Sequence, residues 1–287
     1  MMLAFSLVMI LAIGLIPVGV HLGFRAPRLR QTGTPAAHGL AFEEVRIPTV
    51  RRRHLFGWLL PAAGSTRTVV VLHGWGSNAG LMLPVAAPLQ RSGLNVLLFD
   101  ARGHGNSDSD TFSSLPRFAE DLGMVTTWLK CHHPQRAECI TALGHSVGAG
   151  AVLFEATRNP DIAAVISIAA FADPAQMTAR YLDRLRLPRL MTGLVLRYVE
   201  WVIGHRFATI APVNTVSRIT CPVLLVHGVE DQTVPLIDAR RILANCCAPQ
   251  SRLLEVEGAG HDSVDKIEPQ IGQLLGFIEG ICGAQSH

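Results

Sequence analysis

Short apolar runs alternate with longer amphipathic stretches from residue 41 onward. The apolar runs predict strands at Ala41–Val50, His54–Leu60, Val69–Leu72, Asn95–Phe99, Ile140–Leu143, Val165–Ala169, Pro222–Val226 and Leu253–Val256. The stretches between them predict helices at Ala79–Arg91, Leu115–Cys131, Gly148–Arg158, Leu236–Asn245 and Val264–Ile281. Continuous apolar strands that alternate with helices are typical of an α/β protein, in which helices cover both faces of a mostly parallel sheet.

One interval interrupts the alternation of strands and helices. Residues 173–218 contain no predicted strand, so we expect a helical cap inserted into a core made of residues 41–172 and 219–287. The cap is strongly apolar between Leu187 and Val202, and arginines surround this stretch at positions 186, 189, 197 and 206. Two interpretations stay open: an ordinary lid over a pocket, or a basic apolar helix that lies on a membrane surface.

The first 24 residues form a separate apolar segment. Met1–Phe24 contains no Asp, Glu, Lys or Arg and is long enough to cross a bilayer, which predicts a single-pass membrane anchor. A cleaved signal peptide and a buried helix are the alternatives. Arginines follow in the predicted linker of residues 25–40, at positions 25, 28 and 30, and favour a cytoplasmic location for the rest of the chain by the positive-inside rule. Export, with anchoring on the outer face, stays open.

Composition excludes two broad classes of protein. Apolar residues make up 49% of the chain and charged residues 16%, so intrinsic disorder is excluded. The net charge of +3 gives no support to nucleic-acid binding, which needs a concentrated basic face. The six cysteines are scattered without metal-site spacing, and this pattern predicts free thiols and no metal centre.

The strongest chemical signal lies between a predicted strand and a predicted helix. Gly144-His145-Ser146-Val147-Gly148 is a G-x-S-x-G sequence in the strand–turn–helix context of a nucleophile elbow. Such a turn exposes the serine hydroxyl at the edge of the sheet, next to a helix amino end that favours negative charge. The alternative is an ordinary glycine-rich turn with an unremarkable serine.

A serine hydroxyl needs a base, and the base needs an acid to orient it. His261 follows the last predicted strand and is the candidate base. Asp231 follows the strand before it and is the candidate acid, with Glu230 and Asp262 as rivals. The chain order Ser, Asp, His is the order found in α/β-hydrolases.

Two backbone N–H groups are candidates for an oxyanion hole. His73-Gly74-Trp75-Gly76 follows the strand Val69–Leu72, so the N–H of Trp75 can face the same site as the N–H of Val147. The alternative is that the glycines only permit a turn.

Together these motifs resemble those of α/β-hydrolase fold serine hydrolases, over residues 42–281. The resemblance rests on the motifs at 73–76, 100–107, 144–148, 228–235 and 260–261. It implies Ser146 as nucleophile, Asp231 as acid and His261 as base, with Trp75 and Val147 as oxyanion donors, and it implies no metal or organic cofactor. Arg102 and His104 are interpreted as structural.

The chain looks most like membrane-tethered esterase, lysophospholipase-like or serine-aminopeptidase-like members of that family. We therefore expect hydrolysis of a carboxylic ester or thioester, from a small-molecule or lipid-like acyl substrate. An acyltransferase on the same triad, a non-catalytic binding protein and a peptidase are the alternatives. The oligomeric state is left open.

Overall fold

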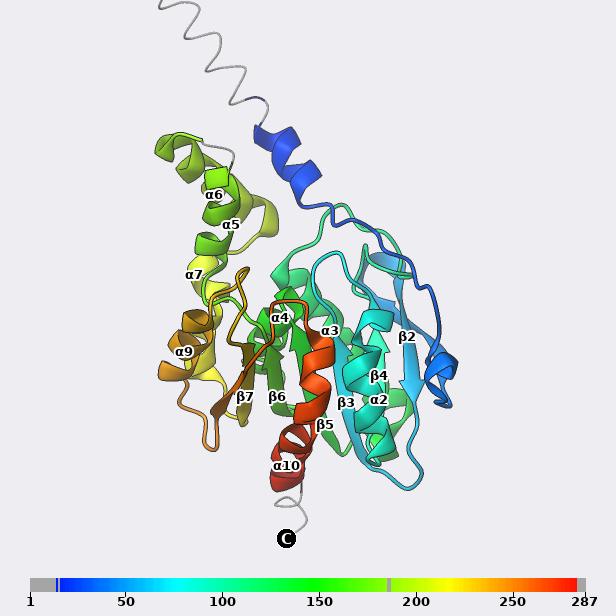
Figure 1. Cartoon of the computed structure of the whole chain (residues 1–287). Coiled ribbons are helices and arrows are strands. Elements are labelled where there is room, and N and C mark those ends of the chain that lie inside the picture. Colours follow the sequence, from blue (N-terminus) through cyan, green and yellow to red (C-terminus); the bar gives the residue numbers. More distant parts are fainter. Residues whose placement is uncertain (1–13, 15, 185–186, 283–287) are drawn as a thin grey trace, which may run out of the picture.

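An eight-stranded sheet lies at the centre of the computed structural model, which describes residues 14, 16–184 and 187–282 (Figure 1). The strands are β1 (Glu43–Thr49), β2 (Arg53–Leu60), β3 (Arg67–Leu72), β4 (Asn95–Phe99), β5 (Cys139–His145), β6 (Ile162–Ile168), β7 (Val223–Gly228) and β8 (Arg252–Val256). Their order is β1-β2-β4-β3-β5-β6-β7-β8. Strand β2 is antiparallel to β1 and β4, and all other neighbours are parallel. The predicted, mostly parallel sheet is confirmed.

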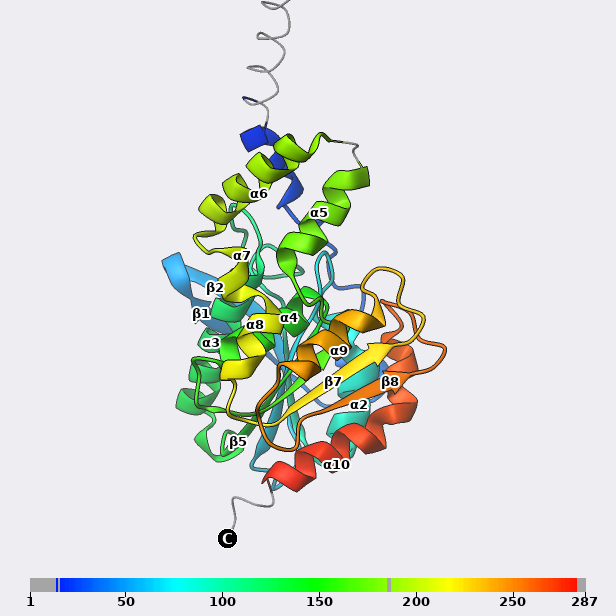
Figure 2. The same cartoon turned by 90° about the vertical axis from the view of Figure 1, so that its left-hand side faces the viewer.

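Helices cover both faces of this sheet because its strands are apolar on both sides. In β4, Val96 and Leu98 join one hydrophobic core, whereas Leu97 and Phe99 join the other. The first core packs against α2 (Leu83–Arg91) and α10 (Ile271–Cys282). The second packs against α3 (Leu115–His132), α4 (Val147–Ala156) and α9 (Leu236–Ala244) (Figures 1 and 2).

Two predicted helices are divided in the structure. The stretch at 79–91 contains η3 (Ala79–Met82) and then α2, and the stretch at 264–281 contains η6 (Val264–Gln270) and then α10. Proline, which lacks the backbone donor, stands in the first turn of α2 and inside η6 at Pro269. Three further turns that the pattern did not predict are η1 (Pro35–His38), η2 (Val50–Arg52) and η4 (Pro134–Arg136).

The chain between β6 and β7 forms helices that stand above the sheet. They are α5 (Pro174–Arg184), α6 (Arg189–Ile203), α7 (Phe207–Ile210), α8 (Pro212–Thr215) and η5 (Val216–Arg218). Figure 2 shows α5 and α6 at the end of the molecule opposite α10. Helix α6 is held to the body by Val195 and Val199, which are buried.

The N-terminal segment also lies at this end. Residue 14 and residues 16–23 are helical, and we call residues 16–23 the N-terminal helix. Much of the predicted membrane anchor, residues 1–24, lies outside the described residues. In the part of the chain that is described, no helix combines the length and the apolar character needed to cross a membrane.

Residues 24–31, which we call the strap, run across the body after the N-terminal helix. The carbonyl of Phe24 accepts a hydrogen bond from the N–H of Ser113, and the Arg28 guanidinium donates to the carbonyl of Ser107 at 2.9 Å. The Gln31 side-chain amide donates to the Asp100 carboxylate at 2.9 Å. Part of the predicted linker is therefore bonded to the core.

One cysteine differs from the prediction of free thiols. Cys139, at the start of β5, is disulfide-bonded, so that prediction is wrong there. Cys131, Cys221, Cys246 and Cys247 are free. No short cysteine spacing includes Cys139, so the sequence offered no local pattern from which to predict this disulfide.

Candidate active site

Ser146 occupies a strained turn between β5 and α4. Its backbone has φ 54° and ψ −117°, a conformation that residues with a side chain rarely adopt. A Cβ on Gly144 would lie 2.2 Å from the carbonyl oxygen of Gly148, and a Cβ on Gly148 would lie 2.4 Å from that of His73. The turn therefore excludes side chains at both glycines, which explains the spacing of the G-x-S-x-G sequence.

Three predicted residues meet at the carboxyl ends of the parallel strands. Nε2 of His261 lies 3.0 Å from Oγ of Ser146, and Nδ1 of His261 lies 2.7 Å from Oδ2 of Asp231. An ionised carboxylate can only accept, so Nδ1 carries the proton and Nε2 is free to accept from the serine hydroxyl. The two rival acids, Glu230 and Asp262, are exposed. The structure thus joins Ser146, His261 and Asp231 in one hydrogen-bonded relay.

The Asp231 carboxylate is held in its ionised form. Burial acts to raise its pKa, but hydrogen bonds from His261 and from the N–H groups of Val234 and Thr233 outweigh burial and keep the pKa below its usual range. The two backbone bonds end on Oδ1, at 2.8 and 2.9 Å, and leave Oδ2 for His261. Asp231 can therefore orient His261 and stabilise its protonated form.

Two further histidines, to which sequence reasoning gave no role, position the relay. Nε2 of His145 donates to the carbonyl of His261 at 2.8 Å, and Nε2 of His227 donates to the carbonyl of Val234 at 2.8 Å. Both rings are buried, and burial lowers the pKa of His145. Their positions in the sequence could have indicated this role, because each histidine stands at the carboxyl end of its strand.

The Trp75 loop, residues 73–76, borders the serine. A Cβ on Gly74 would lie 3.2 Å from Cβ of Ser146, so the backbone of this loop passes close to the hydroxyl. Val147 is the first residue of α4, where helical N–H groups have no partner within the helix. The two predicted oxyanion donors, Trp75 and Val147, therefore lie on segments that flank Ser146.

Comparison with known proteins places the chain in a family. The model of the family described as serine aminopeptidase, S33, matches residues 64–210, just over half of the chain. The chain belongs to this family. It is therefore a hydrolase of the α/β-hydrolase superfamily.

Several known proteins are similar to this chain. An uncharacterized protein of Mycobacterium tuberculosis is 26% identical over 80% of the chain and 76% of its own length. The alpha/beta hydrolase domain-containing protein 17C of Xenopus tropicalis is 26% identical over 88% of the chain and 80% of its own length. The structure of an esterase from Pyrococcus furiosus has a TM-score of 0.73 at 23% identity, over 90% of the chain and 97% of the esterase, and shows the same fold.

The strap covers the outer side of the Trp75 loop in this hydrolase. A Cβ on Gly76 would lie 2.9 Å from the Pro27 ring, and the side-chain amide of Asn78 donates to the carbonyl of Leu29 at 2.9 Å. The ring of Phe24 meets that of Trp75 edge-on, with centroids 6.2 Å apart. Sequence reasoning missed these contacts, because they join residues about fifty positions apart with no repeat to mark them.

A buried histidine pair supports the inner side of the same loop. Nδ1 of His73 donates to the carbonyl of Gly74 at 2.6 Å, so Nε2 accepts from the N–H of Ala101 at 3.0 Å. The ring of His104 lies 5.0 Å from that of His73. Burial lowers the pKa of His73 to about 4 and that of His104 to about 3, so both rings are neutral near pH 7.

Metal binding would compete with the relay. Among the described residues, His145, His261 and Asp262 form a group whose ligand atoms lie within 4.8 Å of one another. Both ring nitrogens of His261 and Nε2 of His145 already have hydrogen-bond partners. An ion at this position would replace the contacts that orient His261.

Proposed function

We propose that this hydrolase cleaves a carboxylic ester or thioester through an acyl-enzyme on Ser146. The observation that carries the proposal is the relay from Ser146 through His261 to Asp231, with hydrogen-bond distances of 3.0 and 2.7 Å. Strain at Ser146 supports it, because unusual backbone conformations in folded proteins concentrate at functional sites.

In the proposed first step, Ser146 attacks the substrate carbonyl while Nε2 of His261 removes its proton. Asp231 holds the tautomer that leaves Nε2 free and stabilises the resulting imidazolium. The N–H groups of Trp75 and Val147 stabilise the tetrahedral oxyanion, and a donor of this kind contributes about 10²–10³ in rate. His261 then protonates the leaving alcohol or thiol, and water repeats the sequence on the acyl-enzyme.

The substrate is an acyl ester that reaches the relay beneath the cap. The similar solved structure from Pyrococcus furiosus is described as an esterase, and this likeness supports a small-molecule or lipid-like ester as the substrate of this hydrolase. The family description supports a second candidate, cleavage of a peptide at its amino end. An acyltransferase would use the same relay, with an alcohol or amine in place of water.

A fluorophosphonate probe, which reacts with activated serines, tests the proposal. We expect the wild type to be labelled and Ser146→Ala to be unlabelled. Ser217→Ala, which removes an exposed hydroxyl on η5, is the matched control and should label like the wild type. Absence of labelling in folded wild-type protein would contradict the proposal and favour a binding protein on a hydrolase scaffold.

Product analysis then separates the candidate reactions. We expect p-nitrophenyl esters and acyl thioesters to be hydrolysed, and aminoacyl p-nitroanilides to be cleaved more slowly. Faster cleavage of the anilides would assign the site to a peptidase. A product that contains an added alcohol acceptor at the expense of free acid would assign it to an acyltransferase.

We also propose that residues 1–24 anchor the hydrolase in a membrane, on the basis of their uncharged, apolar sequence. The arginines at positions 25, 28 and 30 support a cytoplasmic body. The disulfide at Cys139 supports the opposite side, because disulfides persist in oxidising compartments. C-terminal phosphatase and fluorescent-protein fusions decide the side, and release of the intact chain from membranes by salt alone would contradict the anchor.

A further inference from the structure

Helix α6 carries apolar side chains on two opposite faces. Its inner face is buried through Val195 and Val199. On its outer face, Leu190, Leu194 and Trp201 are 71%, 42% and 74% exposed. Positions 190, 194 and 201 fall on one side of a helix, so these side chains form one stripe, which the exposed Arg197 interrupts between Leu194 and Trp201. Exposed apolar side chains that gather on one face can mark a contact with a protein or a membrane.

The N-terminal helix extends this stripe. Val18 and Leu22, one turn apart, are 55% and 61% exposed, whereas Val20 is buried against the body. The ring of His21 meets that of Tyr198 on α6 edge-on, with centroids 6.3 Å apart, so the two helices are in contact. We call the exposed residues Val18, Leu22, Leu190, Leu194 and Trp201 the apolar rim.

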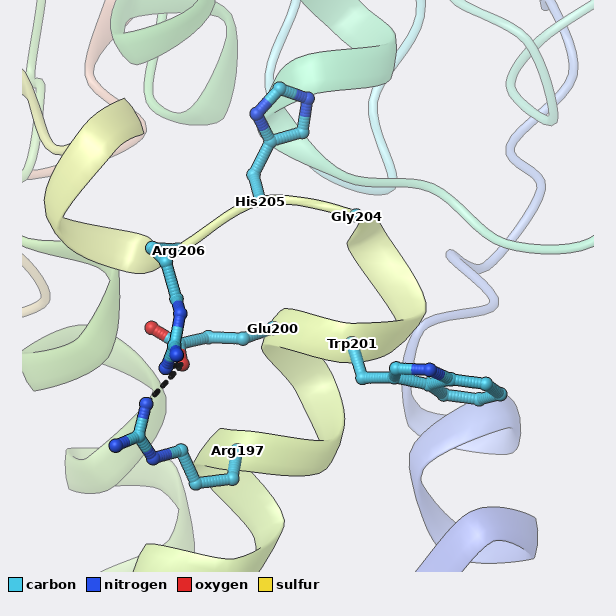
Figure 3. Close-up of a pocket in the computed structure, with 6 residues that line it drawn as sticks. All are labelled: Arg197, Glu200, Trp201, Gly204, His205 and Arg206. Atoms are coloured by element: carbon cyan, nitrogen blue, oxygen red, sulfur yellow. Dashed lines mark hydrogen bonds and ion pairs between the residues drawn. The ribbon is translucent and has the colours of Figure 1, made fainter.

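Positive charge surrounds the apolar rim. Exposed arginines stand on the strap, α5 and α6, at positions 25, 184, 189 and 197, and one exposed acid, Asp183, stands on α5 beside Arg184. At the end of α6, Arg197 and Arg206 both pair with Glu200, at 3.2 and 3.0 Å. These three side chains border an open hollow of about 500 Å³, and Figure 3 shows Trp201 pointing away from them. Two arginines on one glutamate leave that group with a net positive charge.

The geometry points to an anionic phospholipid bilayer as the partner of the apolar rim. Aromatic and aliphatic side chains flanked by arginine suit the boundary between headgroups and acyl chains. Each Lys or Arg near an anionic membrane surface adds to the attraction. The sequence supports a bilayer over a protein partner, because the uncharged, apolar residues 1–13 come shortly before the N-terminal helix, which carries part of the rim.

This inference concerns the placement of the cap on the membrane and does not depend on the proposed reaction. A bilayer against α6 would hold the cap at the lipid surface. The body behind it, with Ser146, would then stand on the aqueous side.

Quenching by brominated lipid tests the contact directly. We would reconstitute the full-length Ser146→Ala protein, which cannot consume lipid by the proposed route, in phosphatidylcholine–phosphatidylglycerol vesicles. The vesicles carry brominated or ordinary acyl chains, and tryptophan emission is the readout. Replacing Trp201 by phenylalanine should remove most of the bromine-dependent quenching. Trp128→Phe is the matched control, because it alters a half-buried ring on α3 and should leave the quenching intact.

A second variant keeps the tryptophan and weakens the contact. Leu190→Ser with Leu194→Ser should reduce the quenching of Trp201 while circular dichroism stays unchanged, because both side chains are exposed. Equal quenching in the Trp201→Phe protein and its parent would overturn the inference. So would a Trp201 signal that ignores bromine and changes with protein concentration, because it would assign the apolar rim to a second copy of the chain.

Discussion

Acid should destabilise the fold through the buried pair His73 and His104. Their folded-state pKa values, about 4 and about 3, lie below the value of about 6.5 expected in an unfolded chain. The unfolded state therefore binds more protons, so the stability is complete above pH 6.5 and declines as the pH falls toward 4 and 3. Protonation of His73 would also leave Nε2 unable to accept from the N–H of Ala101.

The two pKa values set the size of the effect. At pH 5 each histidine is largely protonated in the unfolded chain and neutral in the folded one, which lowers the free energy of unfolding by about 2 kcal/mol relative to pH 7. The pair therefore contributes a loss of about 4 kcal/mol, a large part of the stability of an ordinary domain. His104→Phe keeps a ring against His73 and Phe118 and removes one of the two titrations.

Urea unfolding, followed by circular dichroism at pH 7 and pH 5, measures this loss. In His104→Phe the drop between the two pH values should be smaller than in the wild type by about 2 kcal/mol. Comparing the drop in the wild type with the drop in His104→Phe cancels the contribution of the other titrating groups, which both proteins share. Leu122→Ala, a core change without a titrating group, should lower stability equally at both pH values. An unchanged pH dependence in His104→Phe would refute the reasoning.

Three further predictions concern the site and its supports. Asp231→Asn should lower kcat by about 10⁴ with little effect on KM in an ester assay, because an amide favours the wrong tautomer of the His261 base. A decrease in kcat of less than tenfold would contradict the relay. Gly148→Ala should cost about 1–3 kcal/mol in thermal unfolding because its Cβ meets backbone, whereas Gly272→Ala, which faces open space, should cost nothing. Arg102→Met should cost about 3–5 kcal/mol in urea, because it leaves the buried Asp121 carboxylate without its ion pair at 2.6 Å; a cost below 1 kcal/mol would show that Asp121 is neutral.

Local patterns were sufficient to predict the sheet and the convergence at Ser146. Apolar runs mark strands that are buried on both faces. Glycine is required at the two positions that flank the Ser146 turn, because neighbouring backbone lies too close there for any side chain. Residues at the carboxyl ends of parallel strands meet at one edge, so the positions of Asp231 and His261 after their strands predicted that both would lie near Ser146.

What the sequence did not reveal depends on contacts between distant parts of the chain. The strap has no periodicity, and its glutamine at position 31 matters only because the fold places the Asp100 carboxylate beside it. The positioning role of His145 also depends on a distant contact, because its hydrogen-bond partner is a carbonyl 116 residues away along the chain. Helix ends shifted where proline removed a donor, and the disulfide at Cys139 left no local trace.

The strap changes where the catalytic body begins. A fragment that starts at residue 41 would keep the relay residues, but it would uncover the outer side of the Trp75 loop. It would also lack Gln31, which is the only side-chain hydrogen-bond donor to the buried Asp100 carboxylate among the described residues. A cut after Gln31 would therefore give an impaired hydrolase, whereas a cut before Phe24 would leave these contacts in place. The N-terminal segment and the hydrolase body cannot be separated at an arbitrary bond between them.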